Sequence, residues 1–303
     1  DPETETEPEQ VWPDWLARRF IAALGLEGAR AFARSQLIPA PIDLSFKPEV
    51  DILGYAGPLE GQVIGQSLRL IEPGDVTALA GFEAGDWWVQ DLAAALPATL
   101  LAARPGEKVL DLCAAPGGKT LQMAAAGAEV TALDQSRNRL ARLADNLVRT
   151  QLTASLVEAD ARRWQPSDTL GAGFDAVLLD APCSAMGTLR RHPEGAWIKP
   201  PESVRSLMGL QDELVGAARR LIRPGGRLVY CVCSPLSEEG KSRIDQALAG
   251  GGWKADPFGS GELGGFSNCL TPEGHVLTGP GRRGDGHDSD GFFIARLIRA
   301  EAG

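Results

Sequence analysis

Cysteine and serine stand next to each other at 183–184 and again at 233–234, each time just after an apolar run. A cysteine thiolate is a strong nucleophile, and a positively charged setting favours this ionised form. Lys119 and a helix expected to start near Ser237 are the candidate sources of that charge. Asp180 precedes the first pair and is a candidate to hydrogen-bond or protonate a substrate. We therefore predict covalent or acid–base chemistry around these two cysteines.

A glycine-containing turn, Asp111-Leu-Cys-Ala-Ala-Pro-Gly-Gly-Lys-Thr120, follows another apolar run. Its end fits the phosphate-binding pattern GxxxxGK(S/T), but Cys113 occupies the place of the first glycine. The dinucleotide pattern GxGxxG is absent. The turn therefore favours a nucleoside without a pyrophosphate, such as S-adenosylmethionine, and a plain strand-to-helix turn is the alternative.

Two further acids, Asp134 and Asp160, end the next two predicted strands. A carboxylate at the end of the second strand can accept both hydroxyl groups of a ribose. A carboxylate at the end of the third strand can reach the amino group of an adenine. Either acid alone would more often cap a helix or lie in a loop, but together with the turn 111–120 they predict an adenosine site.

The elements that must position these residues alternate between strands and helices. Apolar strands are expected at 108–113, 129–134, 155–160, 174–180 and 227–233, and a final one at 291–298. Helices are expected up to about residue 103, from the turn 111–120 to about 126, at 137–150, and from about 204 to 222. This alternation predicts an α/β fold, a Rossmann-like parallel sheet with helices on both faces. The carboxyl ends of neighbouring strands would then bring the sulfur atoms of Cys183 and Cys233 together.

The chain ahead of this sheet divides into two further segments. Residues 1–11 contain five acids, no base and two prolines, which predicts a disordered acidic tail or linker. Residues 12–87 combine a helical apolar pattern with short apolar runs, which predicts a small α+β accessory domain. Residues 88–303 form the large domain, in which the glycine-rich stretch 256–290 is expected to be loop.

Composition narrows the class of protein. The chain has 303 residues, 44% of them hydrophobic and 23% charged, which is typical of a globular protein. There is no apolar run of roughly 18 residues, which argues against a membrane-embedded protein. Five cysteines and no secretory leader favour a reducing cytoplasm over a disulfide framework. We expect Cys231 and Cys269 to be buried structural residues, and we predict no metal site, because cysteines and histidines lack ligand spacing.

The net charge of −10 argues against a nucleic-acid partner, since phosphate contacts need Lys and Arg. Without the five acids of the opening segment, however, the net charge is −5. Arg190, Arg191, His192 and Lys199 form the one candidate basic patch. We expect these residues near an RNA path, with a solvated charge cluster as the alternative.

Four motifs resemble the Sun/RsmB-type RNA (cytosine-5) methyltransferases. They are DLCAAPGGKT (111–120), LLDAPCSAMGTLRRHPE (178–194), LVYCVCSPLSEE (228–239) and DGFFIARL (290–297), and the resemblance spans about residues 12–299. It implies a class I methyltransferase fold and S-adenosyl-L-methionine as the cofactor. It also implies an RNA substrate, most simply a cytosine of 16S ribosomal RNA.

The resemblance assigns roles to individual residues. Cys233 would be the nucleophile, Cys183 would assist product release, and Asp180 and Lys119 would complete the catalytic group. Attack by a thiolate on carbon 6 of cytosine activates carbon 5 for methylation. The implied cofactor-binding residues are Cys113, Ala114, Ala115, Pro116, Gly117, Gly118, Lys119, Asp134, Arg139, Asp160 and Asp180.

The chain departs from the family pattern at two places. Val232 precedes the nucleophile where the family usually has threonine, and the stretch 39–45 lacks the usual Arg-x-Asn-like sequence. A helical RNA-binding domain that is frequent in the family does not precede residue 12. Because the chain starts at Asp1 rather than at Met, we expect it to be part of a longer protein.

The sequence leaves three alternatives to ribosomal RNA methylation. A transfer-RNA methyltransferase is the first alternative. A non-catalytic RNA-binding relative is the second, but such a protein should have lost Cys233, Asp180 or Lys119, and all three are present. A nicotinamide-dependent reductase is disfavoured by the missing GxGxxG pattern. We further expect a cytoplasmic monomer.

Overall fold

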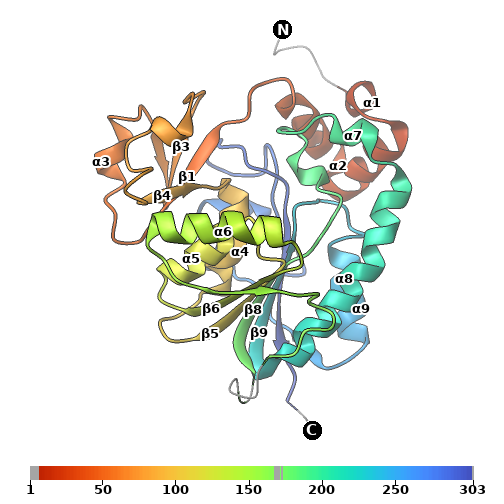
Figure 1. Ribbon diagram of the computed structural model, residues 1–303. Coiled ribbons are helices and arrows are strands. Elements are labelled where there is room, and N and C mark those ends of the chain that lie inside the picture. Colours follow the sequence, from red (N-terminus) through yellow and green to blue (C-terminus); the bar gives the residue numbers. More distant parts are fainter. Residues whose placement is uncertain (1–6, 167–170, 172, 302–303) are drawn as a thin grey trace.

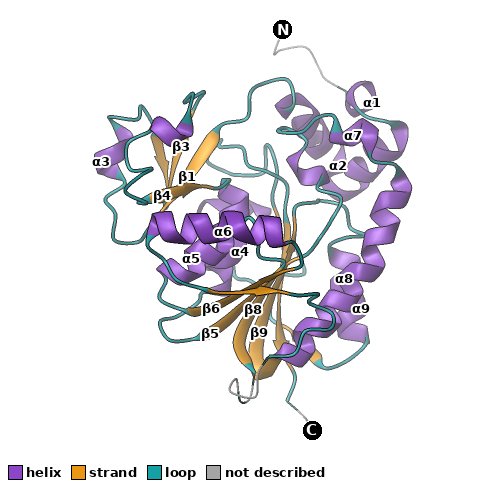
Figure 2. Cartoon of the chain, viewed as in Figure 1, coloured by secondary structure: helices purple, strands orange, loops and turns teal. Residues whose placement is uncertain are grey.

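The computed structural model describes residues 7–166, 171 and 173–301, which form two sheets and their covering helices (Figures 1 and 2). The large sheet has the order β10-β12-β9-β8-β5-β6-β7, and β11 pairs with β12. Its strands are β5 (Lys108–Leu112), β6 (Glu129–Asp134), β7 (Ser155–Glu158), β8 (Phe174–Asp180), β9 (Ile222–Val232), β10 (Trp253–Ala255), β11 (Val276–Leu277) and β12 (Phe293–Arg299). The five strands from β5 to β9 pair in parallel, so their carboxyl ends lie at one edge.

Helices cover both faces of the large sheet (Figure 1). One face carries α4 (Leu92–Leu101), α5 (Gly118–Ala125) and α6 (Arg137–Thr150), and the other carries α8 (Pro201–Leu221) and α9 (Lys241–Ala249). Side chains alternate between the faces of a strand, so Val109 packs under α4 while Leu110 packs under α8. The prediction of a Rossmann-like methyltransferase sheet is confirmed.

Helix α6 illustrates why these segments fold as they do. The Ser136 side chain accepts from the Arg139 backbone N–H and caps the helix, as serine commonly does. Leu140, Leu143 and Leu147 recur at helical spacing and are buried against β6 and α5. The helix ends at Gln151, which has a left-handed conformation.

The edge of the sheet differs from the prediction. The strand β12 runs antiparallel to β9, and β10 and β11 run antiparallel to β12, so the sheet is mixed rather than purely parallel. The stretch 256–290, expected to be loop, contains β11 and two 3₁₀ helices, η4 (Ser260–Glu262) and η5 (Gly264–Cys269). A short strand such as β11 can form in a segment expected to be loop, because pairing with a neighbouring strand needs only a few residues with free backbone N–H and C=O groups.

The second sheet is small and antiparallel, with the order β2-β3-β1-β4. Its strands are β1 (Ile42–Phe46), β2 (Gln62–Ile64), β3 (Ser67–Leu70) and β4 (Trp87–Val89), and α3 (Leu53–Ala56) and η1 (Val76–Ala78) lie between them. It packs beside α6, where the Arg149 guanidinium donates to the backbone oxygens of Phe82 and Trp87 at 2.8 and 3.1 Å.

Helix α2 (Asp14–Ser35) lies away from the small sheet, beside α7 (Gly195–Ile198) and α8 (Figure 1). Trp12, Phe20 and Phe32 pack there against Met186 and Leu236, which belong to the loops after β8 and β9. Of the predicted tail, residues 1–6 lie outside the described residues, and α1 (Pro8–Val11) follows them. The division of the chain into domains at residues 11 and 87 stays a prediction.

Among the described residues, no helix has both the length and the apolar character needed to cross a bilayer.

Candidate active site

The two cysteine loops leave the sheet side by side, because β8 and β9 are parallel neighbours. Asp180 is in register with Cys231, and the Ala181 N–H continues the ladder with a 2.9 Å hydrogen bond to the Cys231 oxygen. The Sγ atoms of Cys183 and Cys233 lie 3.4 Å apart, and both residues are half-buried. The expectation that these two sulfur atoms come together is confirmed.

The loop of Cys183 is fixed by a buried carboxylate that the sequence did not single out. The Ser184 backbone N–H donates to Glu239 Oε1 at 2.7 Å, and the Ser184 hydroxyl donates to the second oxygen of the same carboxylate. Gln211 Nε2 donates to the Pro182 oxygen at 2.9 Å, and Lys199 Nζ donates to the Ser184 oxygen at 2.6 Å. Side chains from three separate parts of the chain, Lys199, Gln211 and Glu239, therefore hold this loop in place.

Glu239 itself is fully buried, although the helix predicted to start near Ser237 would place it in the first helical turn. Helix α9 starts only at Lys241, so the residues before it form a turn that directs this carboxylate inward. The Tyr230 hydroxyl donates to the Glu239 backbone oxygen at 2.5 Å and secures the turn on β9. No spacing pattern reveals such a contact, because the partners Ser184 and Glu239 are far apart in the sequence.

The electrostatic environment of Cys183 and Cys233 is not the positively charged one that the sequence predicts. Lys119 Nζ forms a 2.7 Å ion pair with Asp180, and the helix expected near Ser237 begins later. The hydrogen bond to Cys233, burial and the charge of Glu239 all raise the pKa of Cys183 well above its usual value. Burial and the charge of Asp180 likewise raise the pKa of Cys231. Anionic neighbours thus favour the protonated thiol at Cys183.

Lys119 and Asp180 form the polar end of the site. Lys119 is 9% exposed, and its ammonium lies 5.3 Å from the centre of the Phe292 ring. Burial lowers the pKa of Lys119, but the charge of Asp180 outweighs it, so the net shift is upward. The Asp180 side chain is 31% exposed, which leaves its carboxylate accessible to a substrate.

The turn after β5 is shaped by backbone conformation. Cys113 has φ 63°, the Ala115–Pro116 peptide bond is cis, and Gly117 has φ 109°. The Ala114 N–H donates to the Leu133 oxygen at 3.0 Å, so the turn follows the end of β6 closely. Burial raises the pKa of Cys113, which favours its neutral thiol.

Asp134 links this turn to β6. One carboxylate oxygen accepts from the Ala115 N–H at 3.2 Å and the other from the Ser136 N–H at 2.9 Å. Arg139 lies 3.5 Å from the same carboxylate and donates to the Ala115 backbone oxygen. The carboxylate is buried but keeps lone pairs that could accept ligand hydroxyl groups.

A small hollow of about 50 Å³ lies between these residues and the cysteine loop. Its lining includes Cys113, Asp134, Arg139, Asp160, Arg162 and Pro182. Arg162, which the sequence analysis did not predict, holds the Asp160 carboxylate through a 2.7 Å contact. The mixture of apolar walls, a buried carboxylate and exposed guanidinium groups suits a nucleoside with polar ends. Four of the predicted cofactor-binding residues, Cys113, Asp134, Arg139 and Asp160, therefore line one hollow.

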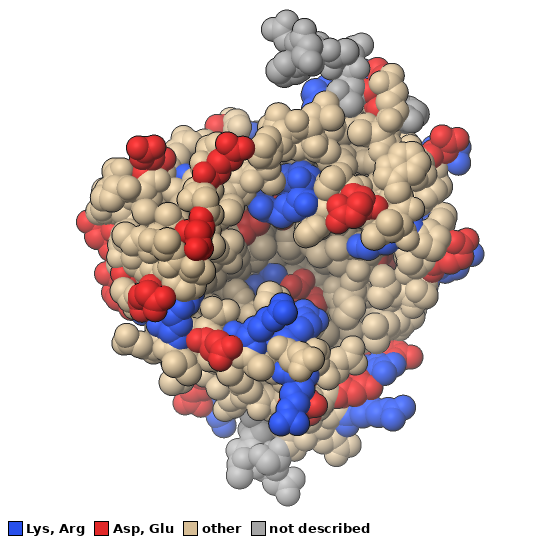
Figure 3. Space-filling model, turned by 45° about the horizontal axis from the view of Figure 1, so that its top comes forward, with Lys and Arg blue, Asp and Glu red and all other residues tan. Residues whose placement is uncertain are grey.

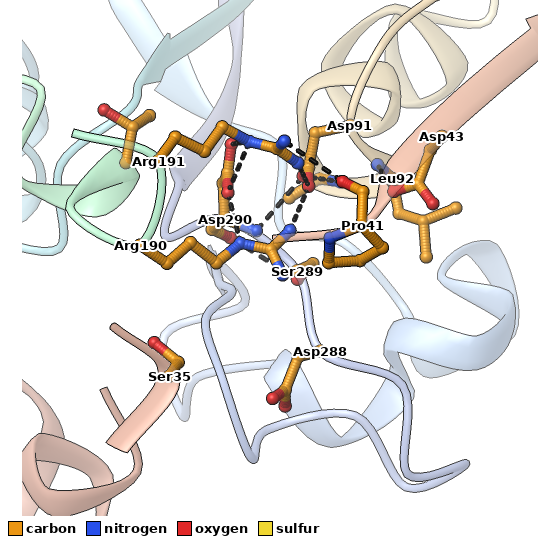
Figure 4. Close-up of polar contacts among 12 residues, drawn as sticks. Ser35, Pro41, Asp43, Asp91, Leu92, Arg190, Arg191, Asp288, Ser289 and Asp290 are labelled. Atoms are coloured by element: carbon orange, nitrogen blue, oxygen red, sulfur yellow. Dashed lines mark hydrogen bonds and ion pairs between the residues drawn. The ribbon is translucent and has the colours of Figure 1, made fainter. Parts of the chain in front are cut away.

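Arg190 and Arg191 do not form the exposed basic patch that the sequence predicts (Figure 4). Arg190 and Arg191 extend between Asp91 and Asp290, and Arg190 Nε donates to Asp290 Oδ1 at 2.5 Å. The Arg191 guanidinium also donates to the Pro41 oxygen at 3.1 Å. Arg190 is 6% exposed, because two acids distant in the sequence neutralise this charge run.

The charge around the hollowed face is mixed rather than basic. Figure 3 shows a recess in this face with Lys and Arg on its borders and Asp and Glu among them. His192 stays exposed and lies 3.3 Å from Glu194, while Lys199 is engaged with the cysteine loop. The expected exposed row of four cations is therefore wrong for Arg190, which is buried, and for Arg191, which is partly buried, whereas nearness to an RNA path stays a prediction.

Residues 98–298 match the family described as 16S rRNA methyltransferase RsmB/F. The chain belongs to this family. It is 40% identical over 244 residues to ribosomal RNA small subunit methyltransferase B of Citrobacter koseri. This alignment covers 77% of this chain and 52% of that protein. The enzyme of the same name from Erwinia tasmaniensis is 39% identical over 242 residues, covering 78% of this chain and 52% of that protein. The chain thus spans about half the length of the curated relatives that it matches.

Two solved structures share the fold along nearly the whole chain. A methyltransferase homologue from Pyrococcus horikoshii aligns with a TM-score of 0.78 and 25% identity, covering 99% of both chains. NSun6 from the same organism aligns with a TM-score of 0.80 and 19% identity, covering 96% of this chain and 99% of that one. The first resemblance agrees with the family, and the second shows the fold alone.

We predict that Gly117→Ala destabilises the protein by about 1–3 kcal/mol, because a side chain rarely adopts this positive φ. The added Cβ would also overlap the Leu143 side chain. Denaturant unfolding checks the difference. Gly209→Ala is the matched control, since Gly209 lies inside α8 without a positive φ and an added Cβ there would meet nothing within 4 Å. Equal stabilities of the two variants would contradict the role assigned to Gly117.

We predict that Arg190→Ala destabilises the fold by roughly 1–3 kcal/mol, because buried Asp91 and Asp290 each lose one of the two guanidinium groups that hold them and keep only Arg191. Arg205→Ala, which removes an exposed arginine from α8, should change stability by less than about 0.5 kcal/mol. Urea unfolding of both variants provides the comparison. A fully stable Arg190→Ala variant would show that this cluster is not structural.

Proposed function

We propose that this chain transfers a methyl group from S-adenosyl-L-methionine to carbon 5 of a cytosine in small-subunit ribosomal RNA. The observation that carries the proposal is the 3.4 Å approach of two thiols beside an accessible carboxylate at the sheet edge. The names of the most similar curated relatives support the RNA class. The cytoplasm and a monomeric state stay predictions within this proposal.

Cys233 is the nucleophile in this proposal. Its thiolate forms a bond to carbon 6 of the cytosine, which breaks the double bond to carbon 5 and makes carbon 5 electron-rich. S-adenosyl-L-methionine supplies the methyl group that carbon 5 then accepts. The target base has to leave its stack to reach a half-buried sulfur atom.

Cys183 completes the reaction in this proposal. After its own proton has passed to solvent, its thiolate accepts the hydrogen of carbon 5 as a proton. The electron pair left on carbon 5 re-forms the double bond, the bond from sulfur to carbon 6 breaks, and the Cys233 thiolate is regenerated. The short distance between the sulfur atoms supports this role, because both thiols then reach adjacent ring carbons.

Asp180 orients the cytosine in this proposal. Its carboxylate accepts a hydrogen bond from the amino group on the polar edge of the ring, and the paired Lys119 ammonium offsets the charge that develops on nitrogen 3. Asp134 holds the ribose of the cofactor, and the turn from Cys113 to Gly118 surrounds it. Asp160 and Arg162 line the adenine end.

Replacing the nucleophile should separate chemistry from binding. We predict that Cys233→Ala loses methylation by at least roughly 10³-fold while it binds S-adenosyl-L-methionine with unchanged affinity. Transfer of radiolabelled methyl to small-subunit RNA and calorimetry with the cofactor measure the two properties. Full turnover by this variant would remove Cys233 from the mechanism.

Replacing the second thiol should trap an intermediate. We predict that Cys183→Ala accumulates a covalent protein–RNA adduct, because the proton on carbon 5 has no acceptor and Cys233 cannot leave. Denaturing gels run after incubation with RNA and cofactor detect the adduct. Cys269→Ala is the control, since Cys269 is buried and its thiol contacts the Arg282 backbone oxygen rather than either thiol of the pair. No adduct under turnover conditions would contradict the release role.

A further inference from the structure

The cysteine pair contains two chemically identical thiols in different surroundings. On the side of Cys183, Ser184 binds the fully buried Glu239 through its backbone N–H and its hydroxyl. On the side of Cys233, Ser234 reaches the same cluster only through a 3.4 Å contact between the two serine hydroxyls. The buried negative charge is therefore placed asymmetrically.

We propose that Glu239 is a positioning residue for the thiol pair, which locks the Cys183 loop against the Cys233 loop and places one buried negative charge beside Cys183. This inference rests on the proposed function, because it concerns how the two thiols divide their roles. A buried charge acts through a low dielectric, so its influence on a nearby thiol exceeds that of a surface acid.

Several groups act on Cys183 together with Glu239. The titratable groups that interact with it are Cys233, Glu239 and Tyr230, and the ammonium of Lys199 contacts the backbone oxygen of the next residue, Ser184. Lys199 brings a positive charge to the Ser184 oxygen and opposes Glu239. Removing the charge of Glu239 leaves Lys199 unopposed, so the Cys183 thiol should ionise at lower pH.

The consequence is a division of labour between the thiols. The charge of Glu239 opposes ionisation of Cys183, which keeps this sulfur from competing for carbon 6 of the base. The same charge increases the affinity of the Cys183 thiolate for a proton, which suits a base that takes the proton from carbon 5. Glu239 touches neither the base nor the cofactor in this scheme and acts only through the loop.

The test is alkylation of the intact protein by iodoacetamide between pH 6 and 10. The two cysteines fall in different tryptic peptides, Trp164–Arg190 and Leu228–Lys241, so mass spectrometry follows each rate separately. We expect Glu239→Gln to raise the alkylation rate of Cys183 at pH 7.5 about tenfold, which corresponds to a midpoint about one pH unit lower. An unchanged Cys183 rate in the folded variant would overturn the proposal.

Two controls separate the charge from loosening of the loop. Glu238→Gln removes an equal charge one residue away, where the acid pairs with Arg19, and should leave the Cys183 rate unchanged. Ser184→Ala removes one donor to the carboxylate but keeps its charge, so Cys183 should stay slow. If Ser184→Ala accelerates alkylation as much as Glu239→Gln does, a loosened loop explains the effect and the proposal fails.

A fallback variant and the independence of the assay from methylation complete the test. Where Glu239→Gln does not fold, Ser184→Ala alone decides, because fast alkylation of Cys183 in that variant contradicts a charge effect. Alkylation needs neither RNA nor S-adenosyl-L-methionine, so its outcome is independent of the proposed methylation. A negative result would leave Cys233 as the proposed nucleophile, whereas loss of the proposed function would leave the alkylation result intact.

Discussion

Parallel pairing of β8 with β9 is the constraint on which the site depends. Because Asp180 and Cys231 are in register, the two loops that follow must leave the sheet at the same height and side by side. A shift of one residue would turn one set of side chains to the opposite face of the sheet. Glu239, Gln211 and Lys199 then only need to hold two loops that already face each other.

Buried charge is used in this protein to fasten loops rather than to attract a partner. Arg190 and Arg191 pair with Asp91 and Asp290, and Lys119 pairs with Asp180. A buried ion pair contributes little net stability over an apolar contact, but it tolerates only a matching partner geometry. These clusters therefore specify which segments meet, and they engage Lys119, Arg190 and Arg191 in ion pairs.

The fold could be predicted where the cause is local. Helix α6 was predicted at its observed bounds, because Ser136 caps it and the leucines recur at helical spacing. The direction of β12 could not be predicted, since an apolar run has the same pattern in either direction. The approach of Cys183 to Cys233 followed from strand order alone, whereas the burial of Arg190 depends on Asp91 and Asp290, each about a hundred residues away.

The cluster around Arg190 also bears on how the polypeptide acquires its finished form during synthesis. The Asp290 backbone N–H donates to Asp91 across 199 positions of the chain. Ribosomes release the amino-terminal part first, so strands β5 to β9 can pair while the last acid is still inside the exit tunnel. While Asp290 is still in the tunnel, the loop after β8 therefore lacks one of the two acids that hold it, and this contact forms late in synthesis.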